Sequence, residues 1–304
     1  MFSRSASTRS WRVSGDDDRP IGLLAGWGKF PFAVAEALRR QGRRVAGVGI
    51  FDHADPRLAD LCDHFGWIGI GGIGRAIRYF QRWGVTQATM AGKVHKVLFY
   101  QPGWWLKHRP DWKAIKAFYP QLLTGAADRK DDTLLRTVVD AFAADGILFQ
   151  PATDYAPELL VQPGHIVGKR LSGKQQKDVE FGWQMAKEMG GLDIGQSVCI
   201  KNQAVLAVEA IEGTDLCIQR AGTLCQTGGF TVVKVAKPRQ DMRFDVPTVG
   251  LKTLETIAAA GGRVLAIEAN RTILLDQHEF CRAAQRLKVA VVALDETAIA
   301  QAAA

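Results

Sequence analysis

The sequence predicts an α/β fold: an N-terminal Rossmann-like domain with a parallel sheet, then a distinct C-terminal α/β domain with a mixed sheet. From Ile21 onward, short apolar runs alternate with amphipathic helical patterns, which is typical of βαβ units with right-handed crossovers. Between residues 151 and 173, prolines and glycines are frequent and the periodicity is lost, which indicates a domain boundary. The 304 residues, 47% hydrophobic and 23% charged, suit a globular protein of two domains.

We therefore expect four parts along the chain. Residues 1–19 are rich in Ser and Arg and lack the apolar core of a secretory signal, which predicts a disordered tail, with an organelle transit peptide as the alternative. The Rossmann-like domain is expected at 20–155, a linker at 156–172 and the C-terminal domain at 173–300.

The pattern of apolar residues in the first half of the chain predicts alternating strands and helices from Ile21 onward. We expect strands at 21–25, 45–50, 67–70, 87–91 and 147–150, and helices at 32–41, 58–65, 73–83 and 131–144. Gly42 and Gly84 directly follow two of these helices, at the position where a helix commonly ends in glycine.

The second half predicts fewer helices and a hairpin. Helices are expected at 174–189, 249–260 and 278–287, a hairpin with strands 197–201 and 204–210 around Asn202, and further strands at 230–236, 264–269, 273–276 and 289–294.

Composition narrows the class of protein. No apolar run approaches the roughly 20 residues that span a bilayer. The five cysteines form no Cys-x-x-Cys pair, which argues against a zinc knuckle, a redox pair or a secreted disulfide framework and favours a reducing cytoplasm. The net charge of +8 comes entirely from residues 1–150, an asymmetry that suits an anionic partner, although scattered solvated charge is the alternative.

Two glycine-containing turns follow predicted strands of the first half. Gly26 and Gly28 precede Pro31 in the turn after the first strand, and Gly92 and Lys93 follow the fourth. At the carboxyl edge of a parallel sheet such turns can approach a phosphate. A dinucleotide-binding turn would have glycine where Pro31 stands, so NAD(P) binding, with Asp52 as the ribose-binding acid, is an alternative. A plain tight turn is a further interpretation of the Gly26 turn, and an exposed basic loop is the alternative for Gly92 and Lys93.

Three acidic clusters lie in the second half, at 193–196, 209–215 and 240–247. Carboxylates beside Lys and Arg supply what Mg²⁺ and a pyrophosphate require, because Mg²⁺ takes oxygen ligands and cations offset the charge that develops on phosphate. Asp241 and Asp245 lie four residues apart, and Thr248 is expected to cap the following helix. Surface ion pairs are the alternative. The histidines have no metal-ligand spacing and no Gly-x-Ser-x-Gly turn is present, so nucleophilic catalysis is unsupported.

Residues 99–113 interleave aromatic and basic side chains outside any clear periodic element. A membrane interface or lipid entrance selects such a mixture, and single-stranded nucleic acid can use the same chemistry. Aromatic side chains that pack a loop onto the core are the third interpretation.

Together these motifs resemble the UDP-2,3-diacylglucosamine pyrophosphatase family of the lipid A pathway, of the two-domain type that lacks the calcineurin-like fold. The resemblance runs from about Ile21 to Leu294. Its carriers are Gly26-x-Gly28-x-x-Pro31, Ala54-Asp55-Pro56, Ala91-Gly92-Lys93-Val94, Asp131-Asp132-x-Leu134-Leu135-Arg136, Asp193-x-Gly195-Gln196, Val208-Glu209-Ala210-x-Glu212-Gly213-Thr214-Asp215 and Arg243-x-Asp245-x-Pro247-Thr248-x-Gly250. Trp27, where a small residue is expected, and Lys96-Val97, where a basic residue followed by Pro is expected, depart from the pattern.

The resemblance implies Mg²⁺-dependent hydrolysis of UDP-2,3-diacylglucosamine to UMP and 2,3-diacylglucosamine 1-phosphate, with the lipid substrate held between the two domains. It implies that Asp245 is essential, in metal binding or in activation of water. We expect Asp241 and Arg243 to share the catalytic role, and Glu209, Glu212 and Asp215 to join Asp245 as metal ligands. Substrate contacts are expected from Gly26, Gly28, Gly92, Lys93, Gln196, Thr214, Lys234, Lys237 and Thr248.

The expected location is the cytoplasm, peripheral to the inner membrane, with no nucleic-acid partner and with a homodimer as an open option. Two other functions remain as alternatives. One is an NAD(P)-dependent oxidoreductase that uses the Gly26 turn, and the other is a non-catalytic nucleotide- or lipid-binding module.

Overall fold

A computed structural model of the chain describes residues 18–94, 103, 107–123 and 131–302. The chain divides into two compact units, Met1–Gln150 and Pro151–Ala304. Most of the predicted tail, residues 1–17, lies outside the described residues, as does much of the aromatic stretch 99–113. Within the described residues, no helix is long and apolar enough to cross a membrane.

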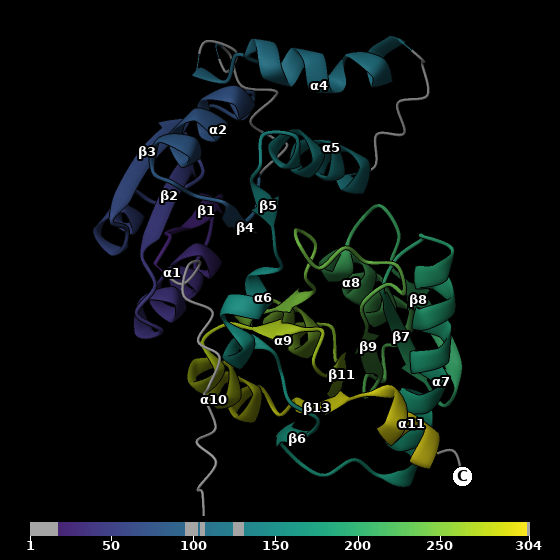
Figure 1. The fold of residues 1–304 in the computed structure, drawn as a ribbon. Helices are drawn as coiled ribbons and strands as arrows, with labels where there is room; N and C mark the ends of the chain where they lie inside the picture. The colour runs from purple at the N-terminus through teal and green to yellow at the C-terminus, as the bar shows by residue number, and fades with distance from the viewer. Residues whose placement is uncertain (1–17, 95–102, 104–106, 124–130, 303–304) are drawn as a thin grey trace, which may run out of the picture. The chain divides into compact units, whose positions relative to one another are not determined.

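The first unit is built on a five-stranded parallel sheet, with the order β3-β2-β1-β4-β5 (Figure 1). Its strands are β1 (Ile21–Ala25), β2 (Val45–Ile50), β3 (His64–Ile68), β4 (Gln87–Ala91) and β5 (Leu148–Phe149). Every residue of β1 and β2 is buried, as expected of central strands covered on both faces. This confirms the predicted parallel α/β sheet.

The helices of the first unit are α1 (Phe30–Arg40), α2 (Ile73–Arg82), α4 (Trp112–Leu123) and α5 (Asp131–Ala143), with the 3₁₀ helix η1 (Pro56–Leu61). Pro31 lies in the first turn of α1, where its missing N–H costs no hydrogen bond. The predicted helix at 58–65 is wrong in its second half, because the chain enters β3 at His64.

Helix α4 was not predicted, and Asp111 explains where it begins. One carboxylate oxygen of Asp111 accepts a hydrogen bond from Ala114 N at 3.0 Å, and the other accepts one from Arg75 N at 3.0 Å. A single aspartate therefore satisfies free N–H groups in the first turns of both α4 and α2.

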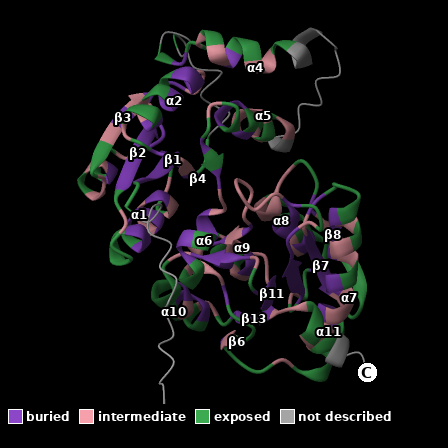
Figure 2. Ribbon diagram, in the orientation of Figure 1, coloured by how far each residue is buried: buried purple, intermediate pink, exposed green. Residues whose placement is uncertain are grey.

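The second unit has three layers, with a six-stranded mixed sheet between two layers of helices (Figures 1 and 2). The strand order of this sheet is β6-β13-β11-β9-β7-β8. Its strands are β6 (Gly164–Val167), β7 (Ser197–Lys201), β8 (Ala204–Val208), β9 (Thr231–Lys234), β11 (Val264–Glu268) and β13 (Ala290–Leu294). β9, β11 and β13 run parallel, whereas β6, β7 and β8 pair antiparallel with their neighbours. The mixed sheet predicted for this half is thereby confirmed.

Helices cover both faces of this sheet. They are α7 (Gly173–Gly191), α8 (Thr214–Leu224), α9 (Leu251–Ala259), α10 (Gln277–Leu287) and α11 (Glu296–Ala302). One apolar cluster joins α8, α9 and α10 to one face, through residues such as Ile218, Leu254 and Phe280. A second cluster joins α7 and α11 to the other face, through Trp183 and Ile299.

Residues 156–172, which the sequence predicts as a linker, contain ordered elements. After the short helix α6 (Ala152–Tyr155) come the 3₁₀ helix η3 (Pro157–Leu159) and then β6. β6 pairs antiparallel with β13 at the edge of the second sheet. The two short strands β10 (Thr248–Val249) and β12 (Ile273–Leu274) form a separate parallel pair.

The predicted hairpin joins β7 to β8 through Asn202 and Gln203, which have φ angles of 50° and 58°. Asp178 of α7 accepts hydrogen bonds from both turn N–H groups, at 3.1 and 2.6 Å. This left-handed turn favours glycine at its second position, and Gln203 carries the conformational strain.

We therefore expect Gln203→Gly to raise the free energy of unfolding by about 0.5–1 kcal/mol, because glycine relieves that strain. Urea unfolding of the wild type and the variant measures the gain. Gln203→Ala is the control, since alanine keeps the strain and should bring no gain. Equal midpoints for the glycine and alanine variants would contradict the argument.

Candidate active site

Polar side chains gather at the edge of the second sheet that is formed by the carboxyl ends of its parallel strands. Lys234 and Glu268 end the parallel strands β9 and β11, and Ser197 begins the antiparallel neighbour β7. Ser197 lies opposite Lys234 in the register of β7 and β9, and Glu209 N donates to Ser197 O at 2.9 Å just beyond β8. The carboxyl ends of parallel strands are the usual ligand-binding edge of an α/β sheet.

Lys234, Thr214 and Glu209 form a connected polar cluster at this edge. Lys234 and Glu209 are buried, with 7% and 8% of their surface exposed. Lys234 Nζ donates to Thr214 Oγ1 at 3.2 Å, and Thr214 Oγ1 donates in turn to Glu209 Oε1 at 2.8 Å. Ser197 Oγ lies 3.4 Å from the same hydroxyl. A buried ammonium and a buried carboxylate thus share one threonine, the first residue of α8.

One carboxylate oxygen of Glu209 has no hydrogen-bond partner within the part of the chain that the structure describes. This oxygen, Oε2, is buried. A buried carboxylate oxygen in this state costs free energy until a donor reaches it. The cluster can therefore accept a hydrogen bond from a ligand hydroxyl or a bound water.

The loop between β9 and β10 carries Asp245 and is held by hydrogen bonds between its own residues. Gln240 Nε2 donates to Asp245 Oδ2 at 2.6 Å, while Gln240 Oε1 accepts from Lys237 N at 2.8 Å. Asp241 binds Arg243 through both carboxylate oxygens, at 2.9 and 2.6 Å. At the far end of the loop, the carbonyl of Thr248 lies 3.5 Å from Lys234 Nζ. The loop therefore begins and ends at the polar cluster.

The predicted role of Thr248 as a helix cap is wrong. Thr248 lies in β10, and its hydroxyl donates to Val246 O at 3.1 Å. Helix α9 begins at Leu251 after Gly250, which makes no side-chain cap.

The four predicted metal ligands lie in different local environments. Glu212 pairs with Arg220 at 2.6 Å and Asp215 pairs with Lys252 at 3.1 Å, whereas Glu209 bonds to Thr214 and Asp245 to Gln240. Among the residues that the structure describes, no group of three or more His, Cys, Asp or Glu side chains could hold a metal ion. The described carboxylates do not by themselves complete a metal site.

Several residues at this edge were not assigned from the sequence. Glu268 is buried, accepts from Ala236 N at 2.7 Å and pairs with Lys187 of α7 at 2.7 Å. Gln240 lay inside a predicted acidic cluster without a role. Of the residues predicted to bind substrate, Lys237 pairs with Asp193 at 2.7 Å, and Gln196 has a buried Oε1 without a partner among the described residues.

In the first unit, the two predicted glycine turns meet each other. Trp27 and Lys93 form a backbone bridge, with Trp27 N–Lys93 O at 2.8 Å and Lys93 N–Trp27 O at 2.9 Å. A Cβ on Gly26 would come within 2.7 Å of Lys93 O, and one on Gly92, whose φ is 98°, within 2.7 Å of Gly26 C. Close packing of two backbones accounts for both glycines without a phosphate.

Asp52 at the same sheet edge is engaged by the chain itself. Its two carboxylate oxygens contact Lys107 Nζ and His108 Nε2, each at 3.2 Å. Ile70 N donates to His108 Nδ1, so the proton of a neutral imidazole sits on Nε2 and points to Asp52. The hydrogen bond from Lys107 is the largest cause of the lowered pKa of Asp52. Nothing here favours Asp52 as a ribose-binding acid.

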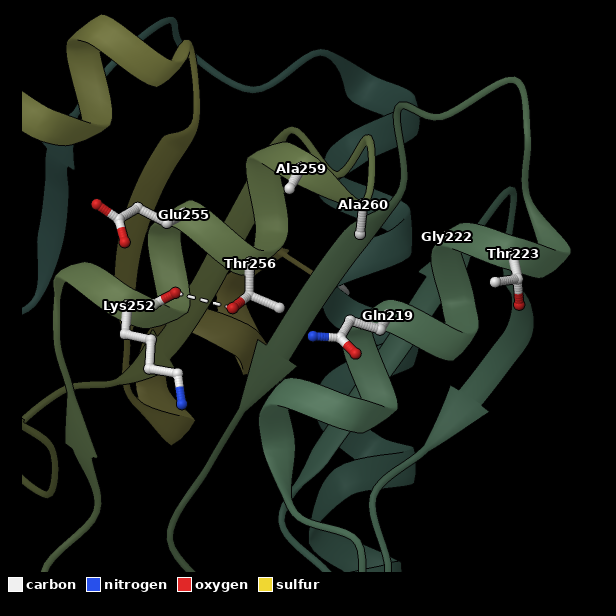
Figure 3. Close-up of a pocket in the computed structure, with 8 residues that line it drawn as sticks. All are labelled: Gln219, Gly222, Thr223, Lys252, Glu255, Thr256, Ala259 and Ala260. Carbon is white, nitrogen blue, oxygen red and sulfur yellow. Dashed lines mark hydrogen bonds between the residues drawn. The ribbon is translucent and has the colours of Figure 1, made fainter.

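A surface groove of about 600 Å³ lies between α8 and α9. Figure 3 shows its lining, in which the hydrogen bond drawn joins Thr256 to the carbonyl of Lys252 within α9. No residue predicted as catalytic, metal-binding or substrate-binding lines it. The candidate site residues of this unit therefore lie outside this groove.

Comparison with known proteins supplies a family. The models of the LpxI N-terminal and C-terminal domains match residues 20–159 and 162–292. The UDP-2,3-diacylglucosamine pyrophosphatase LpxI of Caulobacter vibrioides is 30% identical over 289 residues, which cover 91% of this chain and 98% of that protein. Among solved structures, the MgADP-bound biotin carboxylase domain of Hydrogenobacter thermophilus 2-oxoglutarate carboxylase is 12% identical, over 68% of this chain and 41% of that one, with a TM-score of 0.24. That score is too low for any argument. Because both domain models and a full-length relative match, this chain belongs to the LpxI family.

Proposed function

We propose that this protein hydrolyses the pyrophosphate of UDP-2,3-diacylglucosamine, giving UMP and 2,3-diacylglucosamine 1-phosphate in lipid A biosynthesis. Full-length similarity to an LpxI of that activity supports the reaction. The observation that carries it to this structure is the buried cluster of Lys234, Thr214 and Glu209 beside the loop of Asp245. That the substrate lies between the two domains stays a prediction.

In this proposal, the side chains at the sheet edge divide the work. Lys234 is a buried cation that offsets the negative charge on a phosphate oxygen. The attraction between the two charges is strong there because little water screens it. Thr214 orients Glu209, whose open oxygen accepts a donor from the substrate or from ordered water. Asp245 holds or activates the attacking water, which forms the new P–O bond as the anhydride P–O bond breaks.

Magnesium is proposed as the cofactor. Mg²⁺ commonly binds through one or two carboxylates and completes its shell with water and substrate phosphates, so Asp245 with the pyrophosphate would suffice. When bound, the ion would polarise the pyrophosphate and neutralise the developing charge.

The lipid part of the substrate has a candidate contact surface next to the cluster. Leu192, Ile194 and Ile211 are exposed apolar side chains on the loops before β7 and after β8. The backbones of these loops touch, since a Cβ on Gly195 would come within 2.0 Å of Glu209 O. We propose that these side chains contact acyl chains and help the enzyme to work peripherally at the membrane where its lipid substrate resides. A homodimer stays a prediction.

The test of the function is release of UMP from UDP-2,3-diacylglucosamine dispersed in detergent. With Mg²⁺ we expect sustained turnover, and with EDTA we expect its loss and its return when excess Mg²⁺ is added. No turnover by the folded protein with Mg²⁺, Mn²⁺ or Co²⁺ would overturn the proposed reaction and favour a binding module. Turnover that EDTA leaves unchanged would overturn only the metal. Binding of NAD(P)H to the protein, seen as a change in NAD(P)H fluorescence, would revive the oxidoreductase alternative.

A further inference from the structure

Gln240 is fixed from both ends of its side-chain amide. The residue is buried, with 7% of its surface exposed. Its Oε1 accepts from Lys237 N at 2.8 Å, and its Nε2 donates to Asp245 Oδ2 at 2.6 Å. Since the peptide N–H only donates and an ionised carboxylate only accepts, both contacts require the same orientation of the amide. An amide flip would break both.

The backbone around Gln240 is held as well. Gln240 N donates to Lys237 O at 3.1 Å, which closes a turn, and Asp245 N donates to Asp241 O at 3.0 Å. The neighbouring charges are matched inside the loop and at its start, because Asp241 binds Arg243 and Lys237 binds Asp193. Each of these two turns is closed by its own backbone hydrogen bond, and the hydrogen bond from Gln240 to Asp245 links the two turns.

From this geometry we infer that Gln240 is a positioning residue that holds the Asp245 carboxylate in its working orientation, an inference that rests on the proposed function. A carboxylate that must meet water or a metal at one point loses effectiveness when its side chain can rotate. Burial makes the link durable, because water has little access to compete for the amide. Gln240 does not touch the substrate in this scheme and acts through Asp245.

A second interpretation gives Gln240 only the task of closing its own turn, and one substitution separates the two. Gln240→Glu keeps the side-chain length and the acceptor for Lys237 N–H, but it replaces the donor that faces Asp245 by a second acceptor. Gln240→Leu removes both contacts at similar volume. Gln203→Glu is the matched control, because it makes the same change at the hairpin beyond the opposite end of β7.

At pH 8 we expect Gln240→Glu and Gln240→Leu each to lower kcat by about 10- to 100-fold with little change in KM, as removal of an outer-shell partner commonly does. Gln203→Glu should keep wild-type kcat. Thermal unfolding checks that each variant is folded. A folded Gln240→Glu protein with wild-type kcat overturns the inference, and if that variant does not fold, wild-type kcat in Gln240→Leu overturns it.

A structural readout keeps this test separate from that of the proposed function. We expect crystal structures to show the Asp245 carboxylate ordered toward residue 240 in the wild type and rotated or poorly ordered in Gln240→Leu. An unchanged Asp245 rotamer in the variant overturns the positioning role. If the wild type itself has no turnover, the proposed reaction fails, while the rotamer comparison still decides the role of Gln240.

Discussion

Replacement of Asp245 by Asn is expected to lower kcat by about 10²–10⁴-fold, the range typical of loss of a group that assists proton transfer. Asn keeps the size of the side chain but removes its negative charge, so it neither attracts a divalent cation nor takes a proton from water. The buried amide of Gln240, which now donates to Asp245 at 2.6 Å, would still find an oxygen if the new amide turned its carbonyl toward it. We therefore expect the fold to survive.

The measurement is UMP release under saturating substrate and Mg²⁺, with thermal unfolding as the check on folding. Asp215→Asn is the matched control, since Asp215 lies in the same unit but pairs with Lys252 near the surface. Its kcat should stay near that of the wild type. Equal losses in both variants, or nearly full activity in Asp245→Asn, would remove Asp245 from its proposed role.

Glu268→Gln is expected to destabilise the second unit by about 3–5 kcal/mol, the usual cost of breaking one side of a buried ion pair. Glu268 is 4% exposed and receives hydrogen bonds from two donors, Lys187 Nζ and Ala236 N, each at 2.7 Å. Glutamine offers only one acceptor, so its amide N–H₂ must face one of these donors. Lys187 would also be left with a mostly buried positive charge that no longer faces a carboxylate.

Urea unfolding of the variant measures this loss. The comparison that isolates the pair is the double variant Lys187→Met, Glu268→Leu, which replaces both charges by apolar groups. It should be less destabilised than the sum of Lys187→Met and Glu268→Leu alone, because neither charge is left buried without its partner. Additive losses would show that the two side chains are not coupled.

Loss of Glu268 should also affect the loop of Asp245. Ala236 N donates to Glu268, and Ala236 O accepts from Lys187 Nζ at 3.4 Å, so the ion pair holds the backbone of Ala236, near the start of this loop. Part of any fall in kcat in Glu268→Gln would therefore reflect a displaced loop.

Local signals predicted most of the elements well. Strands such as β1 and β4 end where predicted, because apolar runs and the turns that bound them are local features. Helices α4, α6, α8 and α11 were missed. α8 contains Thr, Cys and Gly, which have weak helix propensity, and it is stabilised by packing of Cys217 and Ile218 against the sheet. The start of α4 is satisfied by Asp111, which also serves α2, a contact that no short window of sequence reveals.

The sequence by itself determined the two α/β halves, the family resemblance and the residue types at the candidate site. Tertiary structure alone decided which of those residues meet. Glu209, Thr214 and Lys234 come together because β7 lies between β8 and β9 and the first turn of α8 returns to the same edge. Glu212 and Asp215 carry the same charge and are close to Glu209 in sequence, yet they pair elsewhere. Strand order and helix packing are set by non-local burial, whereas composition and periodicity record only local preference.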